Sequence, residues 1–330
     1  MLFLDRLKKK TLGLAPLAAA LLGAALLASC GGGDQKETFE AERVVVFGDE
    51  SNVINTDGRK YTVNALKTDA VTPDCTLNPI WVQVVAAHYG RLFPECNPTN
   101  VPNPGGVMKA AFGAKVADVK TQVDSFVAAG GFSKKDLVVM LAGNHDILAQ
   151  FDATPRPTEA QMVATAQLAG TAMGDQVLRI TATGAKVLIS TLPDLSTTPL
   201  GRHAPTDADR LLLNKLTTSF NDKLRVRLAD DPNGGGRSGA LLSADDEVAL
   251  FIANFNNQYG FTNLVDAACT VNTGGVATFM DDAALATDCT TTTANAGAIT
   301  WLWAGRVQLS AAGHSHLGDR AVLRLQANPL

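Results

Sequence analysis

The chain has 330 residues, of which 46% are hydrophobic and 18% are charged, and its formal net charge at pH 7 is −4. This composition is typical of a globular protein and excludes an intrinsically disordered chain. No basic cluster follows the amino-terminal segment, so we expect no nucleic-acid partner.

The amino terminus has the pattern of an export signal. Basic residues precede an apolar run that is too short for a typical membrane span and that ends in Leu27-Ala28-Ser29-Cys30. This ending resembles the lipobox of bacterial lipoproteins, which implies cleavage before Cys30 and lipidation of its sulfur; the alternative is an ordinary secretory signal. Gly31 stands where an aspartate would retain the protein in the inner membrane. We therefore expect an exported lipoprotein, held at the outer membrane through Cys30, on its periplasmic or surface side.

These features divide the chain into a signal peptide (1–29), a flexible tether (30–42) and one large domain (43–330). The domain has four cysteines, which allow three pairings. We predict the local pairing, Cys75 with Cys96 and Cys269 with Cys289, because it closes two loops of similar size. Such bridges persist only in an oxidising compartment.

Strands and helices alternate along this domain. Apolar, β-branched runs predict strands at 44–46, 137–142, 185–190 and 248–252. Amphipathic spacing predicts helices at 79–89, 115–129, 158–182, 207–228 and 310–325. The Thr-, Ala- and Gly-rich residues 267–297 are predicted to form a long surface loop. The alternation predicts an α/β fold, a three-layer α/β/α sandwich around a parallel, flavodoxin-like sheet.

The first predicted strand ends in Phe47-Gly48-Asp49, at the sheet edge where open α/β sheets keep their sites. This ending resembles the first block of the SGNH, or GDSL-type, hydrolases, in which the nucleophilic serine follows at once. Here Glu50 follows, and Ser51 comes one place later. The sequence leaves open whether Glu50 is a substitution or an insertion.

The resemblance continues, in order, over most of residues 43–328 and favours the esterase and phospholipase branch. Ala111 to Val116 resembles the second block, which implies that the Gly113 N–H donates to the oxyanion. Gly143-Asn144-His145-Asp146 lies where the family has Gly-x-Asn-Asp, which puts His145 at the asparagine position with Asn144 beside it. The resemblance implies hydrolysis of carboxylic esters through an acyl-enzyme, and we expect no cofactor and no metal.

The family's Asp-x-x-His segment, before the last helix, is altered. Alignment on Ala312-Gly313-His314 puts Gly305 at the aspartate position and Gln308 at the histidine position. Glycine cannot orient a base, and glutamine cannot accept a proton at neutral pH. One interpretation is therefore a pseudoenzyme that keeps the fold, hydrolyses esters weakly or not at all, and binds an acyl-ester, lipid or glycan ligand.

A rearranged hydrolase is the second interpretation. Ser51 would be a shifted nucleophile, and His314, His316 or His145 would be its base, although the family's equivalent of His314 is generally structural. Ser51, Glu50 and His314 are thus the candidate catalytic residues.

A metallophosphoesterase is a third interpretation. Gly143-Asn144-His145-Asp146 and Gly313-His314-Ser315-His316 match two metal-binding motifs of that class. Against it, the Asp-x-His motif that should precede Gly48 is absent.

Trp301 and Trp303 are spaced by two residues, which favours packing of a strand over a sugar-binding platform.

Overall fold

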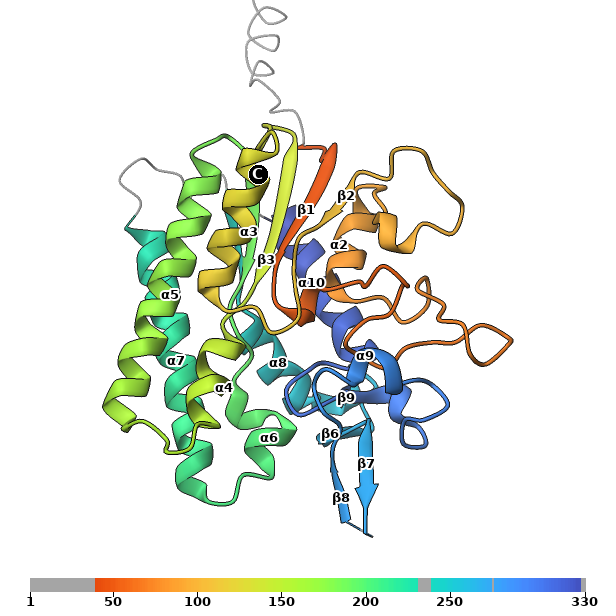
Figure 1. Cartoon of the computed structure of the whole chain (residues 1–330), viewed down its shortest axis with the longest axis vertical. Coiled ribbons are helices and arrows are strands. Elements are labelled where there is room, and N and C mark those ends of the chain that lie inside the picture. Colours follow the sequence, from red (N-terminus) through yellow and green to blue (C-terminus); the bar gives the residue numbers. More distant parts are fainter. Residues whose placement is uncertain (1–38, 231–238, 275, 328–330) are drawn as a thin grey trace, which may run out of the picture. The chain divides into compact units, whose positions relative to one another are not determined.

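A parallel sheet of five strands forms the centre of the domain (Figure 1). The computed structural model describes residues 39–230, 239–274 and 276–327. The sheet strands are β1 (Arg43–Gly48), β2 (Gly106–Met108), β3 (Asp136–Leu141), β4 (Lys186–Ser190) and β5 (Gly239–Leu242). Their spatial order is β2-β1-β3-β4-β5, with every pair parallel. The predicted fold class and its flavodoxin-like order are therefore confirmed.

The strands are apolar because helices cover both faces of the sheet. Val44 to Phe47 of β1 are all 0% exposed, as is Leu137 to Met140 of β3. Continuous apolar runs of this kind are typical of parallel strands buried on both sides. Their side chains and those of the helices form one large hydrophobic core.

The helices lie in two layers. They are α2 (Trp81–His88), α3 (Val116–Ala128), α4 (Asn144–Phe151), α5 (Glu159–Thr181), α6 (Pro199–Arg202), α7 (Asp207–Ala229), α8 (Ala244–Ala253), α9 (Leu285–Asp288) and α10 (Ala311–Ala327). Helices α3, α5 and α7 lie on one side of the sheet, and α2 and α10 lie on the other (Figure 1). Thr158 and Thr206 cap α5 and α7 by accepting hydrogen bonds from backbone N–H groups of the first turn.

The prediction of a strand at 248–252 was wrong, because these residues belong to α8. Asp245, Asp246 and Glu247 fill the first turn of this helix, where carboxylates favour the helix dipole. Its buried residues are Ala244, Val248 and Phe251, spaced by four and three residues as on one face of a helix. The edge strand β5 comes earlier in the chain and has only four residues, so it lacked the long apolar run of a predicted strand.

The prediction that 267–297 is only a surface loop was also wrong. Strand β6 (Asn263–Ala267) pairs in parallel with β9 (Trp301–Trp303), and β7 (Thr270–Thr273) forms an antiparallel hairpin with β8 (Val276–Phe279). Figure 1 shows this hairpin extending away from the central sheet. The Cys269–Cys289 disulfide joins the start of the hairpin to the end of α9.

Both predicted disulfides are present, since Cys75 is bonded to Cys96 and Cys269 to Cys289. The signal peptide and Cys30 lie outside the described residues. Within the described ranges, no helix is long and apolar enough to cross a bilayer.

Candidate functional site

The candidate site lies at the carboxyl edge of the sheet, where β1 turns sharply into the 3₁₀ helix η1 (Glu50–Asn52). Gly48 has a φ of +131°, and a Cβ there would lie 1.9 Å from the carbonyl oxygen of Leu141. Asn52 Nδ2 donates to that same oxygen at 2.7 Å, which joins the ends of β1 and β3. Only glycine permits this close turn.

Glu50 is the residue that occupies the centre of this site. Its side chain is 1% exposed, and its Oε2 accepts from the Gly113 N–H at 3.2 Å. His145 Nε2 lies 2.8 and 2.7 Å from the two carboxylate oxygens, and Gln308 Nε2 donates to Oε1 at 3.3 Å. The structure therefore brings together four of the predicted site residues, which come from four distant parts of the sequence.

Glu50 and His145 form an ion pair at neutral pH. Burial opposes the charge on Glu50, but the hydrogen bond and charge of His145 outweigh it and lower the pKa of the carboxyl. Burial likewise opposes the charge on His145, but the hydrogen bond and charge of Glu50 raise its pKa to about 9. A protonated His145 cannot act as a general base at neutral pH.

Asp49, next to Glu50, differs from it because the pKa of the Asp49 carboxyl is raised. Its side chain is 0% exposed; its Oδ1 accepts from the Ser51 N–H at 3.1 Å, and its Oδ2 has no partner among the described residues. Burial, together with the negative charge of Glu50, raises its pKa well above the ordinary value. This favours the neutral acid at Asp49.

Ser51 does not share the Glu50 site. It lines a separate cavity of about 20 Å³ together with Asn144, His314 and Trp81, a volume that holds about one water molecule. Asn144 Oδ1 is buried and has no hydrogen-bond partner in the described part of the chain. Of the two predicted alternatives for the oxyanion position, His145 therefore meets Glu50, whereas Asn144 lies beside Ser51.

His314 lines the same cavity but is a weak base. It is 1% exposed, and its Nδ1 accepts from the Trp81 N–H at 3.5 Å. Burial, helped by the charge of Lys60, lowers its pKa to about 3. Because Nδ1 is the acceptor, the neutral ring carries its proton on Nε2, which then cannot accept one from Ser51.

His316, the third candidate base, has other partners. Its Nε2 lies 3.0 Å from the carbonyl oxygen of Tyr259. Its ring packs against Phe251, Tyr259 and Phe261. Two of the three histidines that the sequence suggested as bases, His145 and His316, are thus bound to other groups, and only His314 shares a cavity with Ser51.

Gly305, at the aspartate position, has room for a side chain only if its neighbours move. A Cβ there would lie 2.5 Å from Leu285 Cδ1 and 2.6 Å from Gln308 Oε1. Leu285 belongs to α9 and is 0% exposed. Residues of the 267–297 segment have therefore filled the space that an aspartate would need.

Asp282 lies near Glu50, and Arg306 lies beside Asp282; sequence reasoning missed both. Burial raises the pKa of Asp282 to about 6, and the charge of Glu50 also raises it. Its Oδ2 lies 3.9 Å from Arg306 Nε, and Arg306 binds Asp152 at 2.6 Å. No motif in the sequence relates these residues to Glu50, because only tertiary contacts bring them into this region.

Comparisons with solved structures find similar folds. They include LAE5, an alpha/beta hydrolase enzyme from the metagenome of Lake Arreo, at 14% identity over 87% of this chain and 97% of that one, with a TM-score of 0.44. A putative GDSL-like lipase from Parabacteroides merdae is 10% identical over 88% of this chain and 97% of that one, with a TM-score of 0.46. Axe2, an acetylxylan esterase from Geobacillus stearothermophilus, is 17% identical over 87% and 95%, with a TM-score of 0.41. No protein-family model and no curated protein matches the chain.

The two histidine motifs that suggested a metallophosphoesterase have protein partners. His145 is bound to Glu50, and His314 accepts from the Trp81 backbone. Among the described residues, no three His, Cys, Asp or Glu side chains come together as they would to hold a metal.

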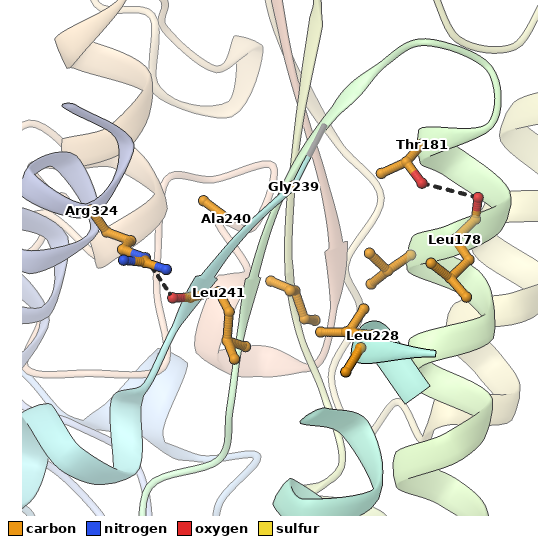
Figure 2. A pocket seen from close by; sticks show the side chains of 10 residues that line it. Leu178, Thr181, Leu228, Gly239, Ala240, Leu241 and Arg324 are labelled. Atoms are coloured by element: carbon orange, nitrogen blue, oxygen red, sulfur yellow. Dashed lines mark hydrogen bonds between the residues drawn. The ribbon is translucent and has the colours of Figure 1, made fainter. Parts of the chain in front are cut away.

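A further hollow, of about 250 Å³, lies beside the edge strand β5 (Figure 2). Its walls include Leu178 of α5, Leu228 of α7 and Leu241 of β5. Two polar side chains of this hollow form hydrogen bonds, with Arg324 Nε donating to the Leu241 carbonyl and Thr181 Oγ1 to the Leu178 carbonyl. This hollow does not include any residue of the Glu50 site.

Proposed function

We propose that this chain is an SGNH-type protein that binds an acyl or glycan ligand and does not hydrolyse esters. One observation carries the proposal: the carboxylate of Glu50 is held by the Gly113 N–H, His145 and Gln308. In serine hydrolases, such donors must be free to stabilise the oxyanion of the transition state.

The charge of Glu50 also opposes ester hydrolysis. A negative carboxylate occupies the donors that a developing oxyanion would need, so a second negative charge there would be repelled. Because Glu50 is buried and paired, its displacement would leave His145 charged without a partner, which costs several kcal/mol. We infer that the pair is a structural feature of the former hydrolase site.

The state of the candidate bases for Ser51 supports the same conclusion. An activated serine needs a neighbouring group that accepts its proton. His145 is protonated by its pairing with Glu50, and the pKa of His314, at about 3, makes it a poor acceptor. The rearranged hydrolase remains the second candidate, because Ser51 and His314 line the same small cavity.

We also propose that the protein is an exported lipoprotein of the outer membrane, anchored through Cys30. The lipobox-like ending of the amino-terminal segment supports this location, as do the two disulfides, which persist in oxidising compartments. Membrane fractionation of the wild-type chain beside Cys30→Ser tests it; recovery of both in the soluble fraction would contradict the anchor.

The function is tested with p-nitrophenyl acetate and p-nitrophenyl octanoate, comparing the full chain with Ser51→Ala. We expect neither protein to exceed the buffer rate, with circular dichroism showing that both are folded. Ester turnover that disappears in Ser51→Ala would overturn the proposal and establish a rearranged serine hydrolase. Cleavage of bis-p-nitrophenyl phosphate that EDTA abolishes would also overturn it, in favour of a metal site.

A further inference from the structure

We propose that a hollow beside the β7–β8 hairpin binds a short neutral carbohydrate. The hollow has a volume of about 700 Å³, within the range of pockets that hold small molecules. It includes neither Glu50 nor Ser51. The inference deepens the proposed binding function, on which it rests, by naming a ligand class and a place for it.

The walls of this hollow come from separate segments that are joined firmly. Hairpin residues Thr270, Thr278 and Phe279 form one side, and Trp301 of β9 and Asn295 form another. The Cys269–Cys289 disulfide fixes the start of the hairpin. The Asn295 N–H donates to the Ala268 carbonyl at 2.8 Å, and its Nδ2 donates to the Ala267 carbonyl at 3.3 Å. A hollow built in this way is largely formed before a ligand arrives, which lowers the entropy cost of binding.

Two aromatic side chains give the hollow its apolar surface. Trp301 and Phe279 are half-buried, and the Phe279 ring lies 6.0 Å from the His203 ring at 61°. Trp303, in contrast, is 0% exposed and donates its indole N–H to the Leu264 carbonyl at 3.2 Å. Both tryptophans belong to strand β9, as predicted, and Trp301 packs partly against buried neighbours. The part of Trp301 that remains exposed lines the hollow, and its apolar surface suits the C–H face of a sugar ring.

Asp266 supplies the polar side of the hollow. Its Oδ1 accepts from His203 Nε2 at 2.9 Å, and its Oδ2 accepts from Asn263 Nδ2 at 2.9 Å. The hydrogen bond from Asn263 lowers the pKa of the carboxyl, which therefore stays ionised. Each carboxylate oxygen keeps a further lone pair that can accept from a hydroxyl group.

The apolar surface of Trp301 and the carboxylate of Asp266 together favour one class of ligand over others. An anionic ligand would be repelled by the carboxylate of Asp266, and a purely apolar acyl chain would displace water from that carboxylate without offering it a hydrogen bond. A neutral sugar satisfies both surfaces, since its hydroxyls can donate to Asp266 while a ring face lies on Trp301. The hydroxyls of Thr270 and Thr278 add further donors and acceptors at the wall.

The experiment uses the full chain with xylotriose, cellotriose, maltotriose and chitotriose at millimolar concentration. Binding is read by tryptophan emission and by calorimetry. Of the three tryptophans, Trp81 and Trp303 are 0% exposed, so a change in emission reports on Trp301. We expect at least one trisaccharide to bind, Trp301→Ala to abolish binding, and Asp266→Asn to weaken it at least tenfold, as expected for a hydrogen bond to a charged group.

The matched control is Ile299→Ala, an exposed position nearby that does not line the hollow and should bind like wild type. Asp266→Asn keeps the proposal testable if Trp301→Ala does not fold. No heat from any of the four trisaccharides, binding unchanged in Asp266→Asn, or binding of octanoate instead would overturn it. Calorimetry measures binding and the ester assay measures turnover, so failure here is distinguishable from failure of the proposed function.

Discussion

Two histidine–carboxylate pairs of this chain differ mainly in their contact with water. The Glu50 and His145 side chains are 1% and 17% exposed, whereas Asp266 and His203 are 50% and 49% exposed. Exposed ion pairs contribute about 0–1 kcal/mol to stability. Removing one partner of a buried pair typically costs about 3–5 kcal/mol, because the other charge is left without compensation. The same two residue types should therefore respond very differently to the loss of their carboxylates.

The substitution Glu50→Gln tests this difference. We expect the pKa of His145 to fall from about 9, since burial lowers it and the hydrogen bond and charge of Glu50 are the main influences that raise it. The free energy of unfolding should fall by about 3–5 kcal/mol. Asp266→Asn is the control and should cost under about 1 kcal/mol. Histidine NMR titration and urea unfolding measure both effects; a His145 pKa that stays near 9 in Glu50→Gln would contradict the pairing.

The same variant should show a characteristic dependence on pH. A raised pKa at His145 means that its stabilisation is complete below 6.5 and is lost as pH rises through about 9. A lowered pKa at Glu50 means that its stabilisation is complete above the ordinary 4.5 and is lost as pH falls below it. The difference in stability between wild type and Glu50→Gln should therefore be largest between pH 4.5 and pH 6.5, the ordinary pKa values of the two groups. A difference that grows above pH 9 would contradict this assignment.

At the scale of elements, the sequence predicts best the strands and helices that have a long local pattern of apolar residues. Strands β1, β3 and β4 are continuous apolar runs, so their type and order could be predicted. The edge strand β5 has four residues, and the hairpin β7–β8 carries exposed side chains such as Val271 and Val276. Neither gives a periodic apolar pattern, so both were missed.

The candidate site, too, could be predicted only in part from the sequence. The family resemblance assigned Gly113, His145 and Gln308 to one site and left open whether Glu50 or Ser51 lies beside Gly113. It could not predict that Leu285 would fill the space beside Gly305 or that Asp282 would lie near Glu50, because the 267–297 segment reaches them only through tertiary packing.

The packing of α5 on α7 offers a test in which helix propensity and packing predict opposite signs. A Cβ at Gly170 would lie 2.2 Å from the Phe220 carbonyl oxygen. A Cβ at Gly174 would lie 2.7 and 2.8 Å from Cγ and Cβ of Arg227, so it also requires a shift, but of the base of a side chain and not of a backbone carbonyl. We expect Gly170→Ala to lower the free energy of unfolding by about 1–3 kcal/mol, because backbone cannot yield.

Gly174→Ala is the matched control, since it places the same methyl group one turn further along the same helix. It should lower the free energy of unfolding by less than Gly170→Ala, because its closest contact is longer and the preference of alanine over glycine in a helix, about 1 kcal/mol, offsets part of the cost. Urea unfolding of both variants measures the difference. A stabilising Gly170→Ala would show that α5 and α7 are less closely packed than the structure has them.

At the scale of the molecule, a second hydrophobic cluster lies apart from the core of the sheet. Its members are buried side chains from the loop after β1 and from the 267–304 region: Val53, Tyr61, Val63, Ala268, Cys269, Met280, Leu285, Ala286, Cys289, Ala298 and Ala304. Asn64 joins the two regions, since its N–H donates to the Cys289 carbonyl at 2.9 Å and its carbonyl accepts from the Thr291 N–H at 2.9 Å. The same cluster thus supports both the wall beside Gly305 and the hairpin of the proposed carbohydrate site.

Comparing the stability lost on removal of each disulfide tests how much the second cluster contributes. They close separations of 20 and 21 residues, so the loss of either should cost about 3 kcal/mol through the entropy of the unfolded chain. Cys269 and Cys289 are both 0% exposed within the second cluster, whereas Cys75 is only partly buried. We therefore expect the double variant Cys269→Ala/Cys289→Ala to lose more stability than Cys75→Ala/Cys96→Ala, and also to lose trisaccharide binding. Urea unfolding and calorimetry of the two variants measure this; equal losses of stability with binding kept in both would show that the second cluster does not hold the hollow in place.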